Sequence, residues 1–112
     1  MNVSAERITQ FSKQEIDQLF QTSKCCFKND ATTILFAPKS KTFARMLLVV
    51  PRATGIAVKR NQLRRRLKDI FKREELSKTL KFDIVIIARK PIMTYSFDEI
   101  KELVKQATIK LL

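Results

Sequence analysis

The segment AVKRNQLRRRLKDIFK, residues 57–72, combines a helical apolar pattern with a high concentration of positive charge. Seven of its sixteen residues are Lys or Arg, and Asp69 is the only acid among them. On a helical wheel at about 100° per residue, one side is apolar and carries Ile56, Leu63, Leu67, Ile70 and Phe71. The nearly opposite side carries Asn61, Arg65, Lys68 and Lys72. The pattern predicts a helix over 56–73 that docks on a sheet by one side and presents a cationic ridge on the other.

The positive charge of the chain is concentrated around this segment. The 112 residues have a net charge of +12, and residues 51–81 hold 11 basic against 3 acidic residues, a net +8. A focused positive field points to a polyanion, which is RNA, DNA or an acidic membrane. A solvated face that promotes solubility is the alternative, but solubility rarely needs charge this concentrated.

Like charges follow one another at helical spacing along the ridge. The pairs Arg60–Arg64, Arg64–Lys68 and Lys68–Lys72 each repel by a few tenths of a kcal/mol. No glutamate offsets them, so we expect an anionic partner here. Arginine forks suit phosphate binding and base stacking. Asn61 both donates and accepts, which suits a base edge or a 2′-OH, although a plain surface role is the alternative.

Capping boxes and apolar runs predict the remaining elements. Ser12-Lys-Gln-Glu15 opens a helix over 13–22 with Ile16, Leu19 and Phe20 on one face, and Ser96-Phe-Asp-Glu99 opens a helix over 97–111. Strands are predicted at 25–27, 32–37, 43–50 and 84–88. The runs Met46–Val50 and Ile84–Ala88 do not alternate, so we predict that both are central strands covered on both faces. The order predicts a single domain, residues 1–112, with the architecture of a small α+β sandwich.

No catalytic or metal-binding set is visible in the sequence. There is no His and no Gly-rich phosphate loop, and the eleven acids show no ligand-like spacing. Asp83, at a strand start, is the one acid of interest, and pairing with a nearby Lys is its favoured role.

The adjacent Cys25 and Cys26 are poorly placed for a disulfide and are predicted to pack in a reducing compartment. The N-terminus lacks the apolar core of a signal peptide, and no apolar run exceeds five residues. We therefore expect a cytoplasmic protein.

The basic segment and its flanking residues resemble a known protein family. The pattern Gly55-x-Ala57-Val58-x-Arg60-Asn61-x-x-Arg64-Arg65-x-x-Lys68-Asp69-x-Phe71-Lys72 is similar to the signature of the bacterial ribonuclease P protein component. The stretch 82–91 resembles the strand that follows in that family. Arg7-Ile8 and Leu19-Phe20 match its N-terminal pattern, so the resemblance covers nearly the whole chain.

The resemblance implies a function in tRNA maturation. In that family the catalyst is a partner RNA with bound Mg²⁺, and the metal has no protein site. The protein binds this RNA and the 5′ leader of precursor tRNA, and it would not cleave alone. The carried-over contacts to the catalytic RNA are Arg52, Arg60, Asn61, Arg64, Arg65, Lys68, Lys72, Arg89 and Lys90. A leader groove between the first helix and the sheet would be lined by Ile16, Phe20 and Phe36. We expect a free monomer, one protein per RNA, and neither DNA nor a membrane as partner.

The resemblance also implies a topology and marks a divergent member. The implied order is α-β-β-β-α-β-α, with a four-stranded mixed sheet in two layers and the basic helix in a left-handed crossover between parallel strands. Such crossovers occur in only about 2% of cases. The chain departs from the family pattern at Ala53, Ile56, Lys68-Asp69, Ile16 and Met46-Leu47.

Four other functions compete with this one. A ribosomal-type RNA-binding protein would share the charge and fold class, and its crosslinked RNA would distinguish it. A DNA-recognition helix lacks a convincing turn-helix partner. A membrane-surface helix would need the apolar face that the core uses. An intrinsic protein nuclease lacks candidate residues.

Overall fold

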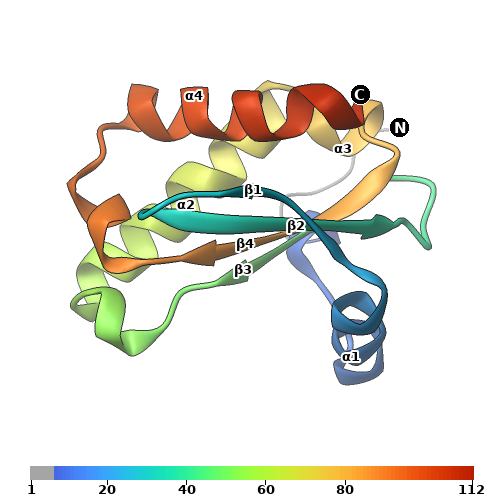
Figure 1. The fold of residues 1–112 in the computed structure, drawn as a ribbon, viewed down its shortest axis with the longest axis horizontal. Coiled ribbons are helices and arrows are strands. Elements are labelled where there is room, and N and C mark those ends of the chain that lie inside the picture. The colour runs from blue at the N-terminus through green and yellow to red at the C-terminus, as the bar shows by residue number, and fades with distance from the viewer. Residues whose placement is uncertain (1–6) are drawn as a thin grey trace.

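A four-stranded mixed sheet organises the chain, with helices on both of its faces (Figure 1). The computed structural model describes residues 7–112. The main elements, in order, are α1 (Lys13–Thr22), β1 (Lys24–Lys28), β2 (Thr32–Pro38), β3 (Met46–Val49), α2 (Ala57–Arg73), α3 (Leu76–Thr79), β4 (Phe82–Ala88) and α4 (Phe97–Thr108). Short 3-10 turns are η1 (Arg7–Thr9), η2 (Arg52–Thr54), η3 (Lys90–Thr94) and η4 (Ile109–Leu111).

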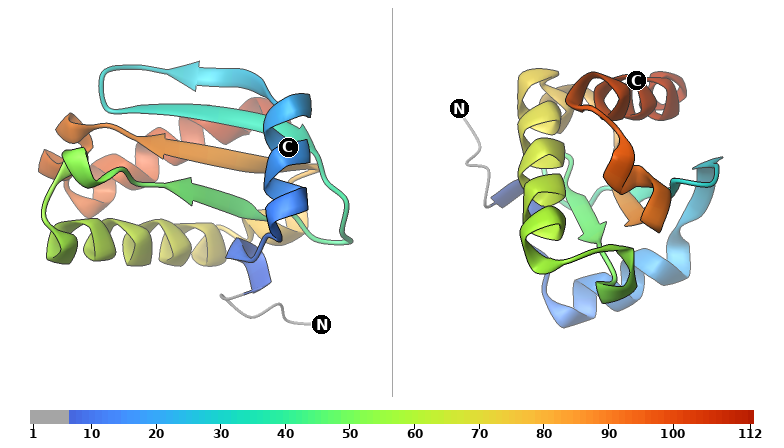
Figure 2. Two further views of the ribbon diagram at one scale, coloured as in Figure 1. Left: turned by 90° about the horizontal axis from the view of Figure 1, so that it is seen from below. Right: turned by 90° about the vertical axis from the view of Figure 1, so that its left-hand side faces the viewer.

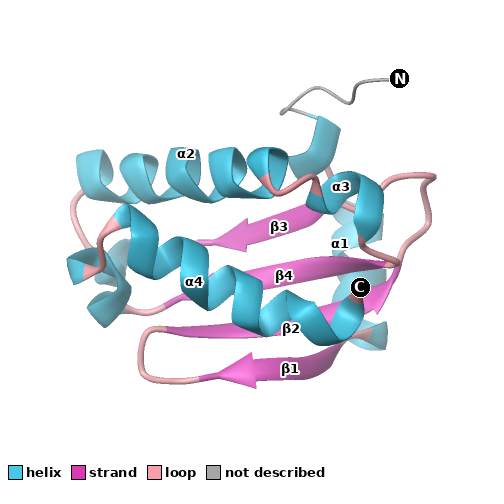
Figure 3. Ribbon diagram, turned by 90° about the horizontal axis from the view of Figure 1, so that it is seen from above, coloured by secondary structure: helices cyan, strands magenta, loops and turns pink. Residues whose placement is uncertain are grey.

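The strand order is β1-β2-β4-β3, and it includes one parallel pair. β2 runs antiparallel to β1 and to β4, while β3 runs parallel to β4. The chain leaves β3, returns along α2 on the helical face and enters β4, and this crossover is left-handed (Figure 3). The α+β class, the four-stranded mixed sheet and the rare crossover are therefore confirmed.

The prediction that β3 is a central strand was wrong. β3 lies at the sheet edge and is shorter than predicted, because residues 43–45 form no sheet pairs. The backbone N–H of Ala44 donates to Ser77 O at 2.8 Å, and that of Arg45 donates to the Asp83 carboxylate at 2.8 Å. The second central strand is β2. The prediction that β3 and β4 are covered on both faces was also wrong, because Leu47, Val49 and Ile87 are only half-buried on the sheet face away from the helical layer.

The main core lies between the sheet and the α2/α4 layer. Leu63, Leu67, Ile70 and Phe71 of α2 are buried there, as the wheel predicts. α4 contributes Ile100, Leu103, Val104 and Ala107. Ile56 does not belong to this core, because it is the N-cap of α2 and is 68% exposed. Its extended backbone makes the helical wheel inapplicable to it.

Among the described residues, α1 is what covers the opposite sheet face, and it does so at one end (Figure 2, left). Both predicted capping boxes are present, at Ser12 and Ser96. Of the three apolar residues predicted on one face of α1, only Leu19 is buried; it packs with Ala37 and Val85. This second cluster is small, so α1 needs other contacts to stay in place.

The two cysteines have different surroundings. Cys26 is half-buried and its Sγ approaches Ile34 O at 3.4 Å, while Cys25 is exposed. Both are free thiols, so the packing role predicted for the pair holds for Cys26 only. Of the helices in residues 7–112, none has the length and apolar content that crossing a membrane would need.

Replacing Leu67 with Ala tests the docking of α2. Leu67 is 1% exposed against the sheet, so its truncation should lower the free energy of unfolding by roughly 2–5 kcal/mol. Val58→Ala on the same helix is the control, because Val58 is 70% exposed and its loss should cost less than about 0.5 kcal/mol. Urea denaturation measures both, and equal losses would contradict this orientation of α2.

Candidate nucleic-acid interface

The side of α2 opposite the core forms the α2 ridge, defined as Asn61, Arg64, Arg65, Lys68 and Lys72. Asn61, Arg65 and Lys72 are exposed, and Arg64 and Lys68 are half-buried. The Asn61 carboxamide oxygen accepts a long hydrogen bond, 3.4 Å, from Arg64 Nη1. This leaves the amide N–H groups of Asn61 outward, beside four cations. The helix thus offers one uncharged donor within a row of phosphate-binding groups.

Four further predicted residues meet at one end of the sheet, in the strand-end cluster: Arg52, Arg60, Arg89 and Lys90. Because β3 and β4 are parallel, their carboxyl ends lie side by side, and α2 begins at that end. Arg52 follows β3 in η2, while Arg89 and Lys90 follow β4. Arg60 is held there because its Nε donates to Gly55 O at 3.1 Å. The cluster continues directly into the α2 ridge, so the topology joins the two predicted groups.

The sheet face away from α2 and α4 is the open face. Strand alternation places Leu35, Leu47, Val49 and Ile87 on it, all half-buried, around the fully buried Val85. Figure 2 (left) shows that α1 crosses one end of this face and that no other helix of residues 7–112 crosses the rest. An aliphatic floor with one helical wall suits a flexible, partly apolar ligand such as a single strand.

The structure brings two of the three predicted groove residues to this face. Glu15, Gln18 and Thr22 occupy the flank of α1 that turns toward Pro38 and Ser40. Helical geometry therefore puts Ile16 and Phe20 on the other flank, along the open face. Ile16 is half-buried, and Phe20 is 43% exposed.

Phe36 was wrongly assigned to the groove. It packs on the main core, with its ring 5.2 Å from the Phe82 ring in an edge-to-face arrangement. Its neighbour Leu35 occupies the open face instead. The run TTILFA does not alternate, so the sequence could not decide which residues point to which face.

Arg89 connects the strand-end cluster to the open face. Its Nη2 donates to Thr33 Oγ1 at 3.0 Å, and Thr33 lies on the open side of β2. The remaining guanidinium donors stay available, since Arg89 is an exposed residue. The Arg89 side chain therefore lies at the edge of the open face and not along α2.

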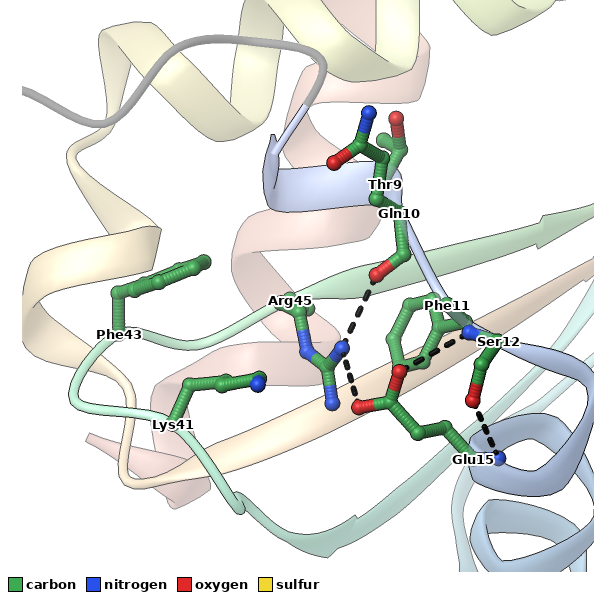
Figure 4. A pocket seen from close by; sticks show the side chains of 8 residues that line it. All are labelled: Thr9, Gln10, Phe11, Ser12, Glu15, Lys41, Phe43 and Arg45. Atoms are coloured by element: carbon green, nitrogen blue, oxygen red, sulfur yellow. Dashed lines mark hydrogen bonds and ion pairs between the residues drawn. The ribbon is translucent and has the colours of Figure 1, made fainter.

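Arg45 fixes α1 to the sheet (Figure 4). It is 3% exposed, and its Nη1 lies 2.8 Å from Glu15 and donates to Gln10 O at 3.0 Å. Its Nη2 lies 3.6 Å from Asp83. The guanidinium also stacks over Phe11, 4.1 Å from the ring centre. Since α1 buries little apolar surface, this ion-pair network supplies much of what holds the groove wall.

The two carboxylates of the network are shifted in opposite directions. The Ser12 backbone N–H, and then Arg45, lower the pKa of Glu15 below its ordinary value of 4.5. Burial raises the pKa of Asp83, and hydrogen bonds and charge from Arg45 oppose that rise. Asp83 was predicted to pair with a lysine and pairs with this arginine instead. It is a structural acid, because its carboxylate is turned to Arg45.

Sequence reasoning missed Arg45, Thr33 and the floor of the open face. Arg45 stands inside the apolar run FARMLLVV, and a charge there was the available signal that a buried partner had to exist. Thr33 and the floor residues carried no such signal, because only the pairing register assigns them to a face.

The charges of the α2 ridge and the strand-end cluster suit a polyanion. No three acidic or thiol side chains converge to hold a metal ion within residues 7–112. The fold and the surface therefore define an α+β sandwich with a basic crossover helix beside a partly uncovered sheet. The family model described as Ribonuclease P matches residues 6–112, and the chain belongs to the ribonuclease P protein family.

Two relatives of known family agree with this membership. The ribonuclease P protein component of Thermotoga maritima is 35% identical over 65 residues, which are 58% of this chain and 56% of that protein. That match thus spans little more than half the length of the relative. The protein component of Borreliella burgdorferi is 28% identical over 101 residues, 88% of this chain and 85% of that one.

Solved structures share the fold. The RNase P protein of Thermotoga maritima superposes with a TM-score of 0.78 at 24% identity, covering 93% of this chain and 97% of that one. The Staphylococcus aureus RNase P protein gives 0.78 at 19% identity, covering 92% and 94%. At such identities these matches establish the fold, and they fit a divergent member.

Glu15→Gln tests the hold of Arg45 on α1. Gln keeps the capping-box acceptor but removes the charge that faces Arg45. The free energy of unfolding at neutral pH should therefore fall by about 1 kcal/mol. Because the folded-state pKa of Glu15 is lowered, this stability is fully present above pH 4.5 and is lost as the pH falls through the folded-state value.

Glu99→Gln is the matched control. The α4 capping box has the same two distances, 2.9 and 3.1 Å, and Glu99 has no ion pair within the described chain. Urea denaturation at neutral pH and at several pH values below 4.5 compares the variants. Equal losses in both, or a Glu15 loss that does not shrink in acid, would contradict the role given to Arg45.

Proposed function

We propose that this chain is the protein subunit of a ribonuclease P holoenzyme, which removes the 5′ leader of precursor tRNA. The single observation that carries this is membership of the ribonuclease P family over residues 6–112. The continuous basic surface from the strand-end cluster along the α2 ridge is consistent with it. A ribosomal-type role is not favoured, because none of the relatives named above has that function.

The catalytic RNA is the proposed partner of the basic surface. Arg52, Arg60, Arg64, Arg65, Lys68, Lys72 and Lys90 would neutralise its phosphates, which makes binding depend on salt. Asn61 would contact a base edge or a 2′-OH, because it is the uncharged donor among them. The catalyst would be that RNA with its own Mg²⁺, and membership of the ribonuclease P family supports this assignment.

The open face is the proposed site for the leader. A single strand would cross the aliphatic floor with Ile16 and Phe20 of α1 on one side and Arg89 at the strand end. Phe20 is the aromatic side chain among these, so we propose one position where a base stacks on an aromatic ring and otherwise apolar and phosphate contacts. Phe36 is excluded from this site by its place in the core.

Reconstitution tests the function. Adding the protein to its cognate ribonuclease P RNA at low Mg²⁺ should increase the rate of 5′ cleavage of precursor tRNA, while protein alone should not cleave. The gain should be larger for substrates with a leader, and Phe20→Ala should weaken precursor binding about fivefold or more without changing mature tRNA binding.

Ile109→Ala is the control for that variant, because Ile109 is an apolar residue exposed to 66%, well separated from the open face. It should behave like the unchanged protein. The absence of any gain with the cognate RNA would rule out the proposed function, whereas a gain that Phe20→Ala leaves intact would rule out only the stacked position.

Arg65→Ala and Lys68→Ala test the ridge. Each change should weaken binding to the catalytic RNA and lower the slope of log K against log salt concentration by about one. Fluorescence titrations between low and moderate KCl measure this. Lys13→Ala, at an exposed position of α1, is the control and should keep the original slope. An unchanged slope in the ridge variants would mean that these side chains face only solvent.

A further inference from the structure

A groove lies between α3 and the C-terminal end of α4, away from the strand-end cluster and the open face (Figure 3). This α3/α4 groove has a volume of about 520 Å³, and the described residues that form its walls are Leu76 and Thr79 on one side and Lys105, Thr108, Ile109 and Leu112 on the other. α4 starts just after the strand-end cluster, and its 12 residues are about 18 Å long, so the groove lies at the far end of the helical layer. The function proposed above does not use it.

The groove exposes aliphatic side chains to solvent. Of the five large apolar residues that are exposed in the described chain, two meet here: Ile109 is 66% exposed and Leu112 is 59% exposed. Leu76 is buried and forms the floor. A left-handed backbone at Glu75 (φ 54°), which is strained for a residue with a side chain, connects α2 to α3 and brings Leu76 to this place.

The two threonines of the groove add apolar surface. Thr108 Oγ1 donates to Val104 O at 2.8 Å, and Thr79 Oγ1 donates to Glu75 O at 3.1 Å. Each hydroxyl is thus used inside its own helix, and the methyl groups are left for a ligand. The groove therefore favours an apolar ligand over a polar one.

The unpaired charge at the groove is positive. Glu74, which also lines it, pairs with Lys101 at 3.5 Å. Lys105 is exposed and has no ion pair within residues 7–112. The net charge of +12 adds a positive field over the whole molecule. A complementary ligand is therefore apolar in its centre and carries a carboxylate that can reach Lys105.

We propose that the α3/α4 groove docks an amphipathic helix of a partner protein. Apolar side chains one turn apart on that helix would lie between Leu76 and Ile109, and a carboxylate beside them would pair with Lys105. Residues 105–112 span about 10 Å, which accommodates about two turns of a partner helix. This partner would be a protein and not an RNA, so the inference does not depend on the function proposed above.

Three other occupants fit the groove less well. A small molecule needs a site that surrounds most of its surface, whereas Ile109 and Leu112 are more than half exposed. RNA would find little here, because none of the described residues that line the groove is aromatic and Lys105 is their one unpaired cation. A second copy would have to pair the same surface with itself, which would bring Lys105 toward its own symmetry mate between two molecules of charge +12.

A designed peptide tests the proposal on the full-length protein. The probe is a fluorescein-labelled helical peptide with leucines at positions i, i+3 and i+4 and glutamates at the flanking positions. One comparison peptide has lysine in place of each glutamate, and another has serine in place of each leucine. Fluorescence anisotropy should show binding of the leucine–glutamate peptide, and both comparison peptides should bind at least about tenfold more weakly.

Variants at exposed positions assign the binding to the groove. Ile109→Ser should weaken binding of the leucine–glutamate peptide about tenfold, while Val58→Ser, at an equally exposed apolar residue of α2, should leave it unchanged. Lys105→Glu should weaken it about fivefold and improve binding of the lysine peptide. Lys24→Glu makes the same charge change on β1 and should alter either affinity by less than about twofold.

The remaining outcomes would overturn the proposal. No binding of the leucine–glutamate peptide at millimolar concentration, or binding that Ile109→Ser leaves intact, would exclude the groove as a helix-docking site. A dimer in analytical ultracentrifugation that Ile109→Ser dissociates would assign the groove to a second copy. Loss of ribonuclease P RNA binding in Ile109→Ser would assign it to RNA. The reconstitution described above is a separate measurement, so failure of the proposed function and failure of this inference are distinguishable.

Discussion

The docking of α2 on the sheet is the contact on which the remaining architecture depends. Leu63, Leu67, Ile70 and Phe71 must leave water together, and each contributes roughly 1.5–3 kcal/mol when fully buried. Once that stripe faces the sheet, helical geometry leaves the cations no direction except outward. Because α2 also connects two parallel strands, its first turn lies at their carboxyl ends. One apolar contact therefore positions the ridge and gathers Arg52, Arg89 and Lys90 beside it.

The other face of the sheet is organised by charge more than by apolar packing. α1 buries Leu19 and little else, and Arg45 compensates by tying Glu15 of α1 to Asp83 of β4. Burying a guanidinium is costly unless carboxylates and hydrogen bonds satisfy it. Arg45 Nε nevertheless has no partner within the described chain. A helix held at one end in this way leaves most of the sheet uncovered, and that uncovered area is the open face.

The different character of the two sheet faces follows from these contacts. The basic crossover helix covers one face of the sheet and points its charges away from it. The open face carries half-buried aliphatic side chains and is bordered by Ile16 and Phe20. Arg89 belongs to both regions, since it follows β4 in the strand-end cluster and bonds Thr33 on the open side.

The sequence by itself determined α1, α2 and α4, the two capping boxes and the two sides of α2, because these depend on local spacing within one element; the short α3 was not predicted. It also carried the ridge residues and the family signature, since both lie within the single segment around residues 55–72. Only the tertiary structure decided that β3 is an edge strand, that Leu35 and not Phe36 faces the groove, and that Arg45 pairs with Asp83. Those outcomes depend on register and on contacts between residues far apart in the chain, and an apolar run without alternation carries no information about either.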